Sequence, residues 1–372
     1  MKELMGIINL SESEGAIKEI TYNRPIATIP IAGRYRVIDY TLSNMVNAGI
    51  HNVAIFTRGK SRSLMDHLGT GKDWDLDRKI DGLFVLNPVI NLDEMITNKG
   101  DIENFKNHMD YIEHSKQKYV LLTRSYMICN VNYGDALKYH KKTGADITII
   151  YKNMENHHHK FINCDTLNLD ASSKVISIGK NTGKTKFYNM SMEMYIMKKE
   201  LFLEIIQKSI STGESEYLKQ AIFLNMKNLN VNAYPFRGYL SCINSIQNYY
   251  KTNMELLDIK ISQELFYKNG LIYTKVKNEP PTKYTDSAKV TNSIVANGCV
   301  IKGTLENSIV GRGVVIKKGA VVKDSIVMSK SVIEERVYLK NVILDKYVHI
   351  TRGKVLYGDK KNSFVIKKNM KL

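Results

Sequence analysis

Hydrophobic residues follow two different patterns along the chain, and the change falls near residue 280. Up to about residue 235, short apolar runs alternate with segments whose apolar residues recur at helical spacing, which predicts an α/β layered domain with a mainly parallel sheet. The predicted strands are Leu4 to Leu10, Asn52 to Thr57, Tyr119 to Arg124, Ala145 to Tyr151 and Val231 to Phe236. The predicted helices cover residues 36–49, 102–116 and 243–259.

The C-terminal part repeats one short unit. The apolar pairs that begin at Ile294, Ile309, Ile326 and Ile343 are separated by steps of 15, 17 and 17 residues, with Gly or Asn at the bends. Short strands joined by tight corners at this period predict a left-handed parallel β-helix. An antiparallel sandwich would show hairpin dipeptides between its strands, and Asn297-Gly298 is the only Asn-Gly pair in these repeats.

These patterns divide the chain into four continuous parts. We expect an α/β domain over residues 1–245, a helix and linker over 246–285, a β-helix over 286–357 and a tail over 358–372. The linker contains the adjacent prolines Pro280 and Pro281, which interrupt regular structure.

The composition of the chain is notable mainly for its strong positive charge. The chain carries 54 Lys and Arg against 37 Asp and Glu, a net charge of +17, which indicates either an anionic partner or a lysine-rich surface. The basic residues are interpreted as spread along the chain, and no nucleic-acid-binding motif is present, so we expect phosphorylated metabolites rather than nucleic acid as partners.

Other residue patterns argue against several kinds of site. Four isolated cysteines give no metal or disulfide framework, which fits a reducing compartment. Residues 156–161, "NHHHKF", are interpreted as a solvated loop rather than a metal site. No apolar run is long enough to span a membrane, and the N-terminal run is too short for a signal peptide. We therefore expect a cytoplasmic protein with no membrane partner.

Four segments together resemble the ADP-glucose pyrophosphorylase (glucose-1-phosphate adenylyltransferase) family. They are "GRYRVIDYTLSNMVNAGI" at 33–50, "WDLDR" at 74–78, "NMSMEMYIMKKELF" at 189–202 and "NVILDKYVHI" at 341–350. The resemblance implies a nucleotidyltransferase domain followed by a β-helix, and a reaction in which glucose 1-phosphate attacks the α-phosphate of ATP. Such a reaction requires two anions to be positioned and their charge to be stabilised.

Several residues that the family uses for this reaction are replaced. Asn9 and Leu10 stand where the family has paired glycines, and Glu12 and Glu14 add negative charge to the loop. The two aspartates that bind Mg²⁺ in the family align with Tyr126 and Cys242, which are poor ligands for a hard cation. Of the adenine-side motif, only the glycine of "GDIEN" at 100–104 is kept. We therefore expect no catalytic residue and no metal or other cofactor on this chain.

Two family positions are retained on the sugar-phosphate side. Lys180 and Ser191 match the family motif, so they could form a remnant of the substrate pocket, although Lys180 could equally be an exposed loop lysine. The segment that contains Arg24, Arg34 and Arg36 matches one that recognises phosphorylated effectors in the family. Arginine suits phosphate because its planar group donates two parallel hydrogen bonds, but Arg36 could instead pair with Asp39.

The replaced residues resemble those of the GlgD-type subunits of this family. That resemblance implies a regulatory, non-catalytic chain which modulates a catalytic GlgC-type partner in glycogen biosynthesis, in a heterotetramer, with Mg²⁺ on the partner. Two alternatives remain open: an active nucleotidyltransferase that uses Glu12, Glu14 or Asp101 as rearranged metal ligands, and an anion- or nucleic-acid-binding protein. The β-helix could also belong to an acyltransferase with His349 as its base, but four short coils are few for such an enzyme.

Overall fold

The computed structural model describes residues 2–89, 100–155, 161–360 and 362–372. The chain forms two compact units that interleave along the sequence. The first contains residues 1–12, 41–240 and 269–271, and the second contains residues 13–40, 241–268 and 272–372. The chain therefore crosses from one unit to the other several times, whereas the sequence suggested continuous domains.

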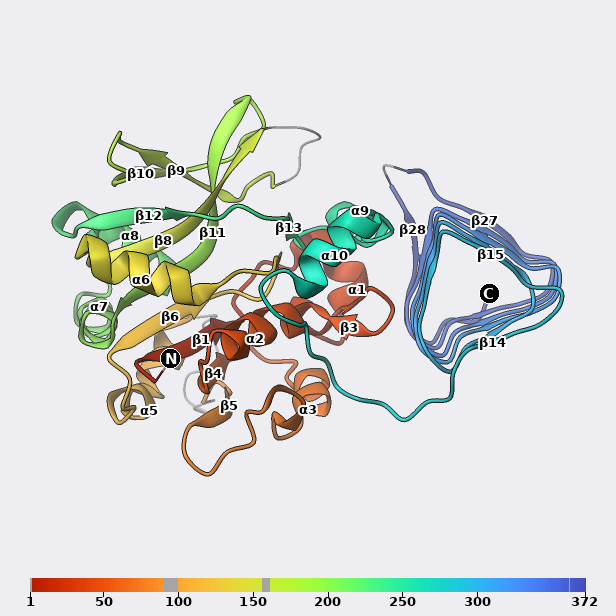
Figure 1. The fold of residues 1–372 in the computed structure, drawn as a ribbon, viewed down its shortest axis with the longest axis horizontal. Coiled ribbons are helices and arrows are strands. Elements are labelled where there is room, and N and C mark those ends of the chain that lie inside the picture. The colour runs from red at the N-terminus through yellow and green to blue at the C-terminus, as the bar shows by residue number, and fades with distance from the viewer. Residues whose placement is uncertain (1, 90–99, 156–160, 361) are drawn as a thin grey trace. The chain divides into compact units, whose positions relative to one another are not determined.

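A nine-stranded mixed sheet forms the centre of the first unit (Figure 1). Along its main path the strand order is β10-β9-β11-β6-β1-β4-β5, and β8 pairs with both β11 and β12. The neighbours β6, β1, β4 and β5 are parallel, whereas β11 runs antiparallel to β6, β8 and β9. The strands are β1 (Leu4–Asn9), β4 (Asn52–Phe56), β5 (Gly82–Leu86), β6 (Tyr119–Thr123), β8 (Ile147–Glu155), β9 (Asp165–Leu169), β10 (Val175–Lys180), β11 (Phe187–Lys198) and β12 (Val231–Pro235).

Helices cover the sheet and complete its core. Four of them, α4, α5, α7 and α8, supply apolar residues to one cluster with the central strands, and α6 packs on β8, β11 and β12. Their bounds are α3 (Arg62–Leu68), α4 (Ile102–Lys106), α5 (Met109–Glu113), α6 (Tyr133–Thr143), α7 (Lys199–Thr212) and α8 (Leu218–Asn225). The segment expected to form one helix over 102–116 is thus two short helices, α4 and α5.

The second unit joins an N-terminal segment to two C-terminal segments that are far from it in sequence. Its N-terminal part contains α1 (Lys18–Thr21) and a hairpin of β2 (Pro30–Ile31) and β3 (Tyr35–Arg36), and it leads into α2 (Val37–Asn47), which ends in the first unit. Residues 241–268 contribute β13 (Ser241–Cys242), α9 (Ile246–Glu255) and α10 (Ile259–Tyr267). The Tyr249 hydroxyl donates a 2.7 Å hydrogen bond to the Pro30 carbonyl, and the Tyr250 hydroxyl donates one of 2.6 Å to the Asp324 carbonyl. Helix α9 thereby ties the hairpin to the repeats.

The repeats form a β-helix of triangular cross-section with three parallel five-stranded sheets (Figure 1). Their strand orders are β14-β17-β20-β23-β26, β15-β18-β21-β24-β27 and β16-β19-β22-β25-β28. The bounds are β14 (Lys283–Tyr284), β15 (Lys289–Thr291), β16 (Ile294–Val295), β17 (Val300–Ile301), β18 (Thr304–Glu306), β19 (Ile309–Val310), β20 (Val315–Ile316), β21 (Val321–Lys323), β22 (Ile326–Val327), β23 (Val332–Ile333), β24 (Tyr338–Lys340), β25 (Val342–Leu344), β26 (His349–Ile350), β27 (Val355–Tyr357) and β28 (Phe364–Ile366).

The register of these sheets confirms the repeat that the sequence predicts. Ile294 pairs with Ile309, Ile309 with Ile326, and Ile326 with Ile343. A fifth coil, which the repeat did not reveal, pairs Ile343 with Val365, so strand β28 lies within the segment expected to be a tail. Its step is longer because six residues separate β27 from β28, whereas one separates β24 from β25.

One corner of the β-helix explains why Asn and Asp recur beside Ser. Four residues there adopt a left-handed backbone conformation, which Asn and Asp tolerate better than most residues; they are Asn292, Asn307, Asp324 and Asn341. Where a serine follows, its hydroxyl accepts a hydrogen bond from the next coil, as Ser293 does from the Ser308 N–H and Ser308 from the Ser325 N–H. The corner repeats because each coil satisfies the backbone of its neighbour.

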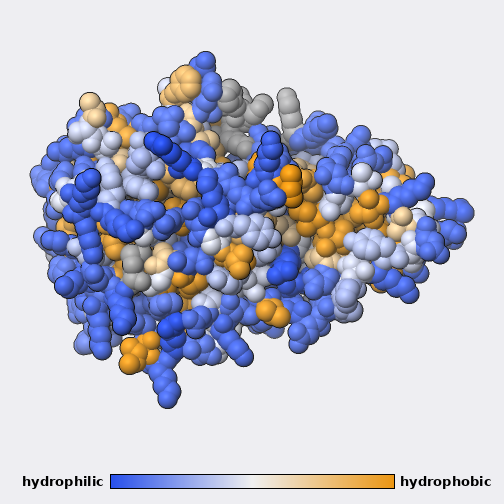
Figure 2. Space-filling view, in the orientation of Figure 1, coloured by the Kyte–Doolittle hydropathy of each residue, from blue (hydrophilic) through white to orange (hydrophobic). Residues whose placement is uncertain are grey.

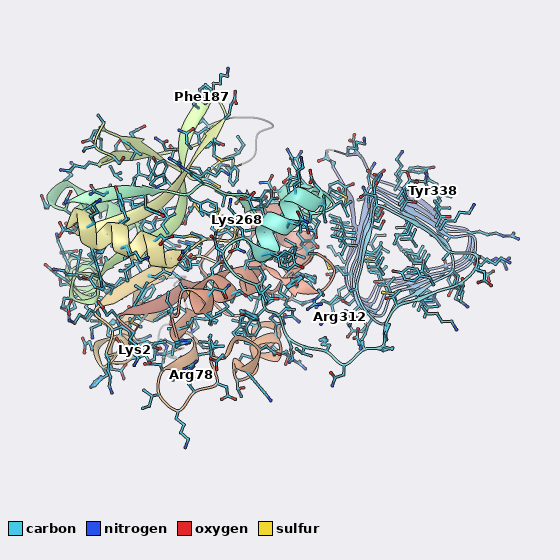
Figure 3. The ribbon with its side chains drawn as sticks, viewed as in Figure 1. Lys2, Arg78, Phe187, Lys268, Arg312 and Tyr338 are labelled. Atoms are coloured by element: carbon cyan, nitrogen blue, oxygen red, sulfur yellow. The ribbon has the colours of Figure 1, made fainter. Side chains whose placement is uncertain are left out.

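The positive charge is concentrated in the second unit, not spread evenly as the sequence pattern suggested. Residues 272–372 contain 20 Lys and Arg against 8 Asp and Glu, so this segment carries most of the excess. Figure 2 shows a surface that is mostly hydrophilic, with scattered apolar residues, and Figure 3 shows Tyr338 on the outside of the β-helix. Among the described residues, no helix is long and apolar enough to cross a membrane.

Candidate functional site

The loop that follows β1 is held in place by its own polar side chains. The Asn9 amide and the Ser11 hydroxyl both donate to one carboxylate oxygen of Asp101, at 2.6 and 2.8 Å. The other oxygen of Asp101 accepts the Leu218 N–H at 2.6 Å. Asp101 therefore closes this loop against the start of α8, and both of its oxygens are already in use.

Glu12 attaches the end of the same loop to the residues that follow β6. Its carboxylate accepts the backbone N–H of Ser125 at 2.7 Å and the Ser125 hydroxyl at 2.8 Å. Burial raises the pKa of Glu12, and the nearby Arg124 guanidinium opposes that rise. A loop that binds a triphosphate offers backbone N–H groups to the ligand, whereas this loop brings a carboxylate and receives an N–H.

Tyr126 and Cys242, which align with the family's metal ligands, are both buried. Tyr126 lies in the first unit between β6 and β7 (Met127–Ile128), and its hydroxyl donates a 2.6 Å hydrogen bond to Glu193. Cys242 lies in β13 of the second unit. Across the described ranges, no group of three His, Cys, Asp or Glu side chains is placed to hold a metal ion.

Glu193 lies at an irregularity in the long strand β11. The pairing of β11 with β8 shifts between Ser191 and Met194, and Glu193 has a positive φ of 53°. A bulge of this kind redirects a side chain that regular pleating would place elsewhere. The Glu193 carboxylate consequently reaches Arg124 and Lys219, each at 3.0 Å.

The retained residues Lys180 and Ser191 belong to the same network. Lys180 lies 2.8 Å from Asp165, which also forms an ion pair with Lys219, and the Ser191 hydroxyl accepts the backbone N–H of Glu193 at 3.2 Å. The Lys180 side chain is 60% exposed although it is paired with Asp165, as one of the two alternatives predicts, and Ser191 supports the bulge.

The three arginines expected to bind an anion differ from one another. Arg24 is buried and forms an ion pair of 2.5 Å with Asp345, so its charge is already neutralised. Arg34 is exposed, and its guanidinium lies 5.1 Å from the centre of the Tyr35 ring. For Arg36, the backbone N–H donates to the Asp39 carboxylate at 2.9 Å, at the start of α2.

Lysines of the β-helix segment lie near these arginines. Burial and the charges of Arg36 and Arg24 lower the pKa of Lys346 to about 6, with a smaller contribution from Lys277 and a partial opposing effect from Asp345. Burial, followed by Arg312 and Arg36, also lowers the pKa of Lys277. In this part of the second unit, positive charges outnumber the carboxylates that could neutralise them.

Comparison with known proteins identifies the family of this chain. A model described as nucleotidyl transferase matches residues 17–258, and one described as GlmU-like, C-terminal hexapeptide matches residues 280–365. The "Glycogen biosynthesis protein GlgD" of Bacillus subtilis (strain 168) is 35% identical over 99% of this chain and 96% of its own length. The chain belongs to the ADP-glucose pyrophosphorylase family.

Both kinds of relative within the ADP-glucose pyrophosphorylase family align along most of the chain. The "Glycogen biosynthesis protein GlgD" of Geobacillus stearothermophilus is 37% identical over 86% of this chain and 83% of its own length. The "Glucose-1-phosphate adenylyltransferase" of Fervidobacterium nodosum is 29% identical over 95% of this chain and 85% of its own length. The fold expected from the family resemblance is therefore confirmed, while the roles of individual residues stay predictions.

The family resemblance did not reveal the residues that occupy the centre of this site. Arg124, Asp165, Glu193 and Lys219 form the network, yet the resemblance gave none of them a role, although Glu193 lies within the quoted segment 189–202. One signal was present in the sequence: Glu193 is the only charged residue between Tyr188 and Met197, in an otherwise apolar and weakly polar run. A buried charge of this kind requires a partner, but the sequence does not say which one.

The "WDLDR" segment has a structural role in the first unit. Trp74 is buried and its ring meets that of His67 edge-on, at 5.6 Å. Arg78 forms an ion pair with the Asp75 carboxylate and donates a 2.8 Å hydrogen bond to the Asp75 carbonyl. These contacts support the interpretation that the family motif pins a loop here. Residues 156–160, which include the three histidines, lie outside the described residues.

Proposed function

We propose that this chain is a regulatory, non-catalytic subunit of glucose-1-phosphate adenylyltransferase that acts in glycogen biosynthesis beside a catalytic chain of the same family. The relatives named GlgD support the pathway, and the structure supports the absence of catalysis through one observation. The polar groups on the substrate side of the first unit are engaged with one another: Glu12 with Ser125, Asp101 with Asn9, and Glu193 with Arg124.

The engagement of these carboxylates matters because adenylyl transfer needs a bound cation. Adenylyl transfer requires a cation to neutralise the charge that spreads over the phosphoryl oxygens, and Mg²⁺ takes that role when carboxylates hold it. The described carboxylates near Tyr126 are occupied by protein donors and cations, so a metal would have to displace them. We therefore assign Mg²⁺ to the catalytic partner in a hetero-oligomer, for which a heterotetramer is our proposal.

The proposal predicts no measurable turnover by this chain alone. Purified chain with ATP, glucose 1-phosphate and Mg²⁺ should form no ADP-glucose, because the carboxylates that the structure describes near Tyr126 are already engaged and are not free to hold the metal. Mixed with a catalytic glucose-1-phosphate adenylyltransferase chain from the same source, it should co-elute in size-exclusion chromatography and change the partner's kcat or its response to effectors. Turnover by the isolated chain would contradict the proposal, as would a mixture that behaves as the sum of two separate proteins.

A second prediction separates lost ligands from a lost phosphate loop. The double substitution Tyr126→Asp and Cys242→Asp restores two carboxylates, but it leaves the loop from Asn9 to Glu12 attached to Asp101 and Ser125. We expect turnover to stay undetectable in the same assay. The conservative pair Tyr126→Phe and Cys242→Ser serves as the matched control for folding. Near-normal activity in the aspartate variant would show that the metal ligands alone were missing and would favour an active enzyme with rearranged ligands.

An anionic effector is the second part of the proposal. Arg34 and Lys277 are exposed and Lys346 is half-buried, and partial burial together with neighbouring positive charges lowers the pKa values of the two lysines. A phosphorylated metabolite would supply the missing negative charge. We therefore infer that Arg34 and these lysines take part in effector binding, while Arg24 holds the local structure through Asp345. Equilibrium dialysis of a phosphorylated effector with Arg34→Gln tests this assignment, which fails if affinity is unchanged.

A further inference from the structure

The Glu193 carboxylate is surrounded by donors in a way that resembles a bound ion more than a surface ion pair. Arg124 Nε lies 3.0 Å from one of its oxygens, and Lys219 Nζ lies 3.0 Å from the other. The Tyr126 hydroxyl donates to that second oxygen at 2.6 Å. Glu193 itself is only 4% exposed. Two cations and a hydroxyl therefore converge on one pair of oxygens.

The backbone conformation of Glu193 is energetically unfavourable. Its φ of 53° lies in the left-handed region, which costs of order 1 kcal/mol or more for a residue with a side chain. Such a conformation persists only where surrounding contacts determine it. Burial alone would raise the pKa of Glu193, but Arg124, Lys219 and the Tyr126 hydroxyl outweigh it and lower the pKa. The side chain is thus held as an anion by its donors.

We propose that Arg124, Lys219 and Tyr126 form an oxyanion-binding site that this chain fills with its own Glu193 carboxylate. The ligand class that the donors suit is a tetrahedral oxyanion such as inorganic phosphate, because arginine, lysine and a hydroxyl are its usual partners. The chain keeps the site closed by presenting a tethered carboxylate, which no soluble anion at ordinary concentration can displace.

Neighbouring charges determine which anion the opened site would accept. With Glu193 removed, Arg124, Lys219 and Lys180 would face three carboxylates, those of Glu12, Asp101 and Asp165, so the cluster would be one negative charge short of its present balance. One oxyanion would restore the balance. Asp165 forms an ion pair with Lys219, and its negative charge favours a small anion over a large, highly charged polyphosphate.

The inference has a regulatory consequence that rests on the proposed function. If Glu193 replaces a ligand anion, the donors of the first unit stay engaged whether or not substrate is present. A catalytic partner would then always meet this chain with the same contacts in place, and its regulation would not depend on substrate binding to this chain.

The experiment compares Glu193→Gln and Glu193→Gly in the full chain with the matched control Glu204→Gln, an exposed glutamate on α7. Thermal unfolding is followed with and without about 20 mM inorganic phosphate, against chloride at equal ionic strength. We expect both Glu193 variants to melt at least about 5 °C below the unaltered chain. Phosphate should restore a large part of that loss, while it should leave the unaltered chain and Glu204→Gln nearly unchanged.

Several results would overturn the proposal. It fails if phosphate raises the melting temperature of all four proteins equally, or if the Glu193 variants melt lower and do not respond to phosphate. If Glu193→Gln does not fold, refolding with and without phosphate decides the matter, since the proposal requires phosphate to promote folding. A negative result leaves the proposed function standing, because that function is tested by ADP-glucose formation with and without the partner.

Discussion

Replacing Asp345 with alanine is expected to destabilise the second unit by about 3–5 kcal/mol, because it leaves a buried cation without its partner. Arg24 and Asp345 form an ion pair of 2.5 Å, and the two residues are 5% and 3% exposed. The second oxygen of Asp345 accepts the backbone N–H of Lys346 at 2.6 Å. Removal of the carboxylate therefore also leaves an N–H without its acceptor.

Chemical denaturation, followed by far-ultraviolet circular dichroism, measures this loss. Asp286→Ala is the matched control, since Asp286 is an exposed aspartate in the same β-helix, and it should change the free energy of unfolding by less than about 0.5 kcal/mol. The double variant Arg24→Met with Asp345→Leu should recover much of the stability, because it removes both charges together. Equal effects of Asp345→Ala and Asp286→Ala would show that the pair contributes little.

Replacing Lys346 with methionine should have the opposite effect and stabilise the chain at pH 7, by about 2 kcal/mol or more. Burial and the nearby Arg36 and Arg24 lower the pKa of Lys346 to about 6. At pH 7 the folded chain must therefore keep this lysine largely neutral, whereas the unfolded chain keeps it protonated, and that difference opposes folding. Methionine fills similar space without a charge.

The free energy of unfolding should change with pH in a defined direction. Between pH 6 and the unfolded pKa near 10.5, the unfolded chain binds one more proton at Lys346 than the folded chain. Stability therefore rises with pH, by at most about 1.4 kcal/mol per unit. The range from pH 7 to 8.5 is suitable because it lies between the ordinary pKa values of 6.5 for histidine and 9.0 for cysteine, while the folded-state pKa values of His140 and Cys129 are about 4 and about 12, so both groups hold nearly the same number of protons in the two states.

The measurement is the free energy of unfolding at several pH values for the unaltered chain and Lys346→Met. The slope with pH should be smaller in the variant. Lys318→Met, at an exposed corner of the same β-helix, should keep the original slope. The prediction is contradicted if both variants show the same slope as the unaltered chain. If Lys346 also contacts an effector, the variant should gain less stability from that effector than the unaltered chain does.

The sequence predicted the layers of the fold because local patterns specify them. The apolar pair that recurs at Ile294, Ile309, Ile326 and Ile343 places one residue inside the β-helix in every coil, so the period alone indicates the architecture. The strands β1, β4 and β6 were visible for a similar reason, since buried strands are continuous apolar runs. The fifth coil was missed because an insertion breaks the period before Phe364.

The centre of the site was beyond sequence analysis because it depends on long-range contacts and on one backbone irregularity. The sequence interprets Tyr126 as a poor metal ligand, but it does not indicate its partner Glu193, which lies 67 positions away. The bulge that directs Glu193 toward Arg124 has no turn residue to indicate it, because the left-handed position is occupied by glutamate instead of glycine. Similarly, the resemblance interprets Lys180 as a retained residue, but its ion pair with Asp165 depends on the pairing of β9 with β10.

The interleaving of the two units limits how this protein can be divided or recombined. The segments 13–40 and 241–268 belong with the β-helix, although most of the α/β sheet lies between them in the chain. A cut near Pro280 would release a β-helix without α9 and without the segment that contains Arg24, so Asp345 would lose its counter-ion. The repeats are therefore not an exchangeable cassette, and grafting them alone onto another enzyme of this family should yield an insoluble or poorly folded chimera.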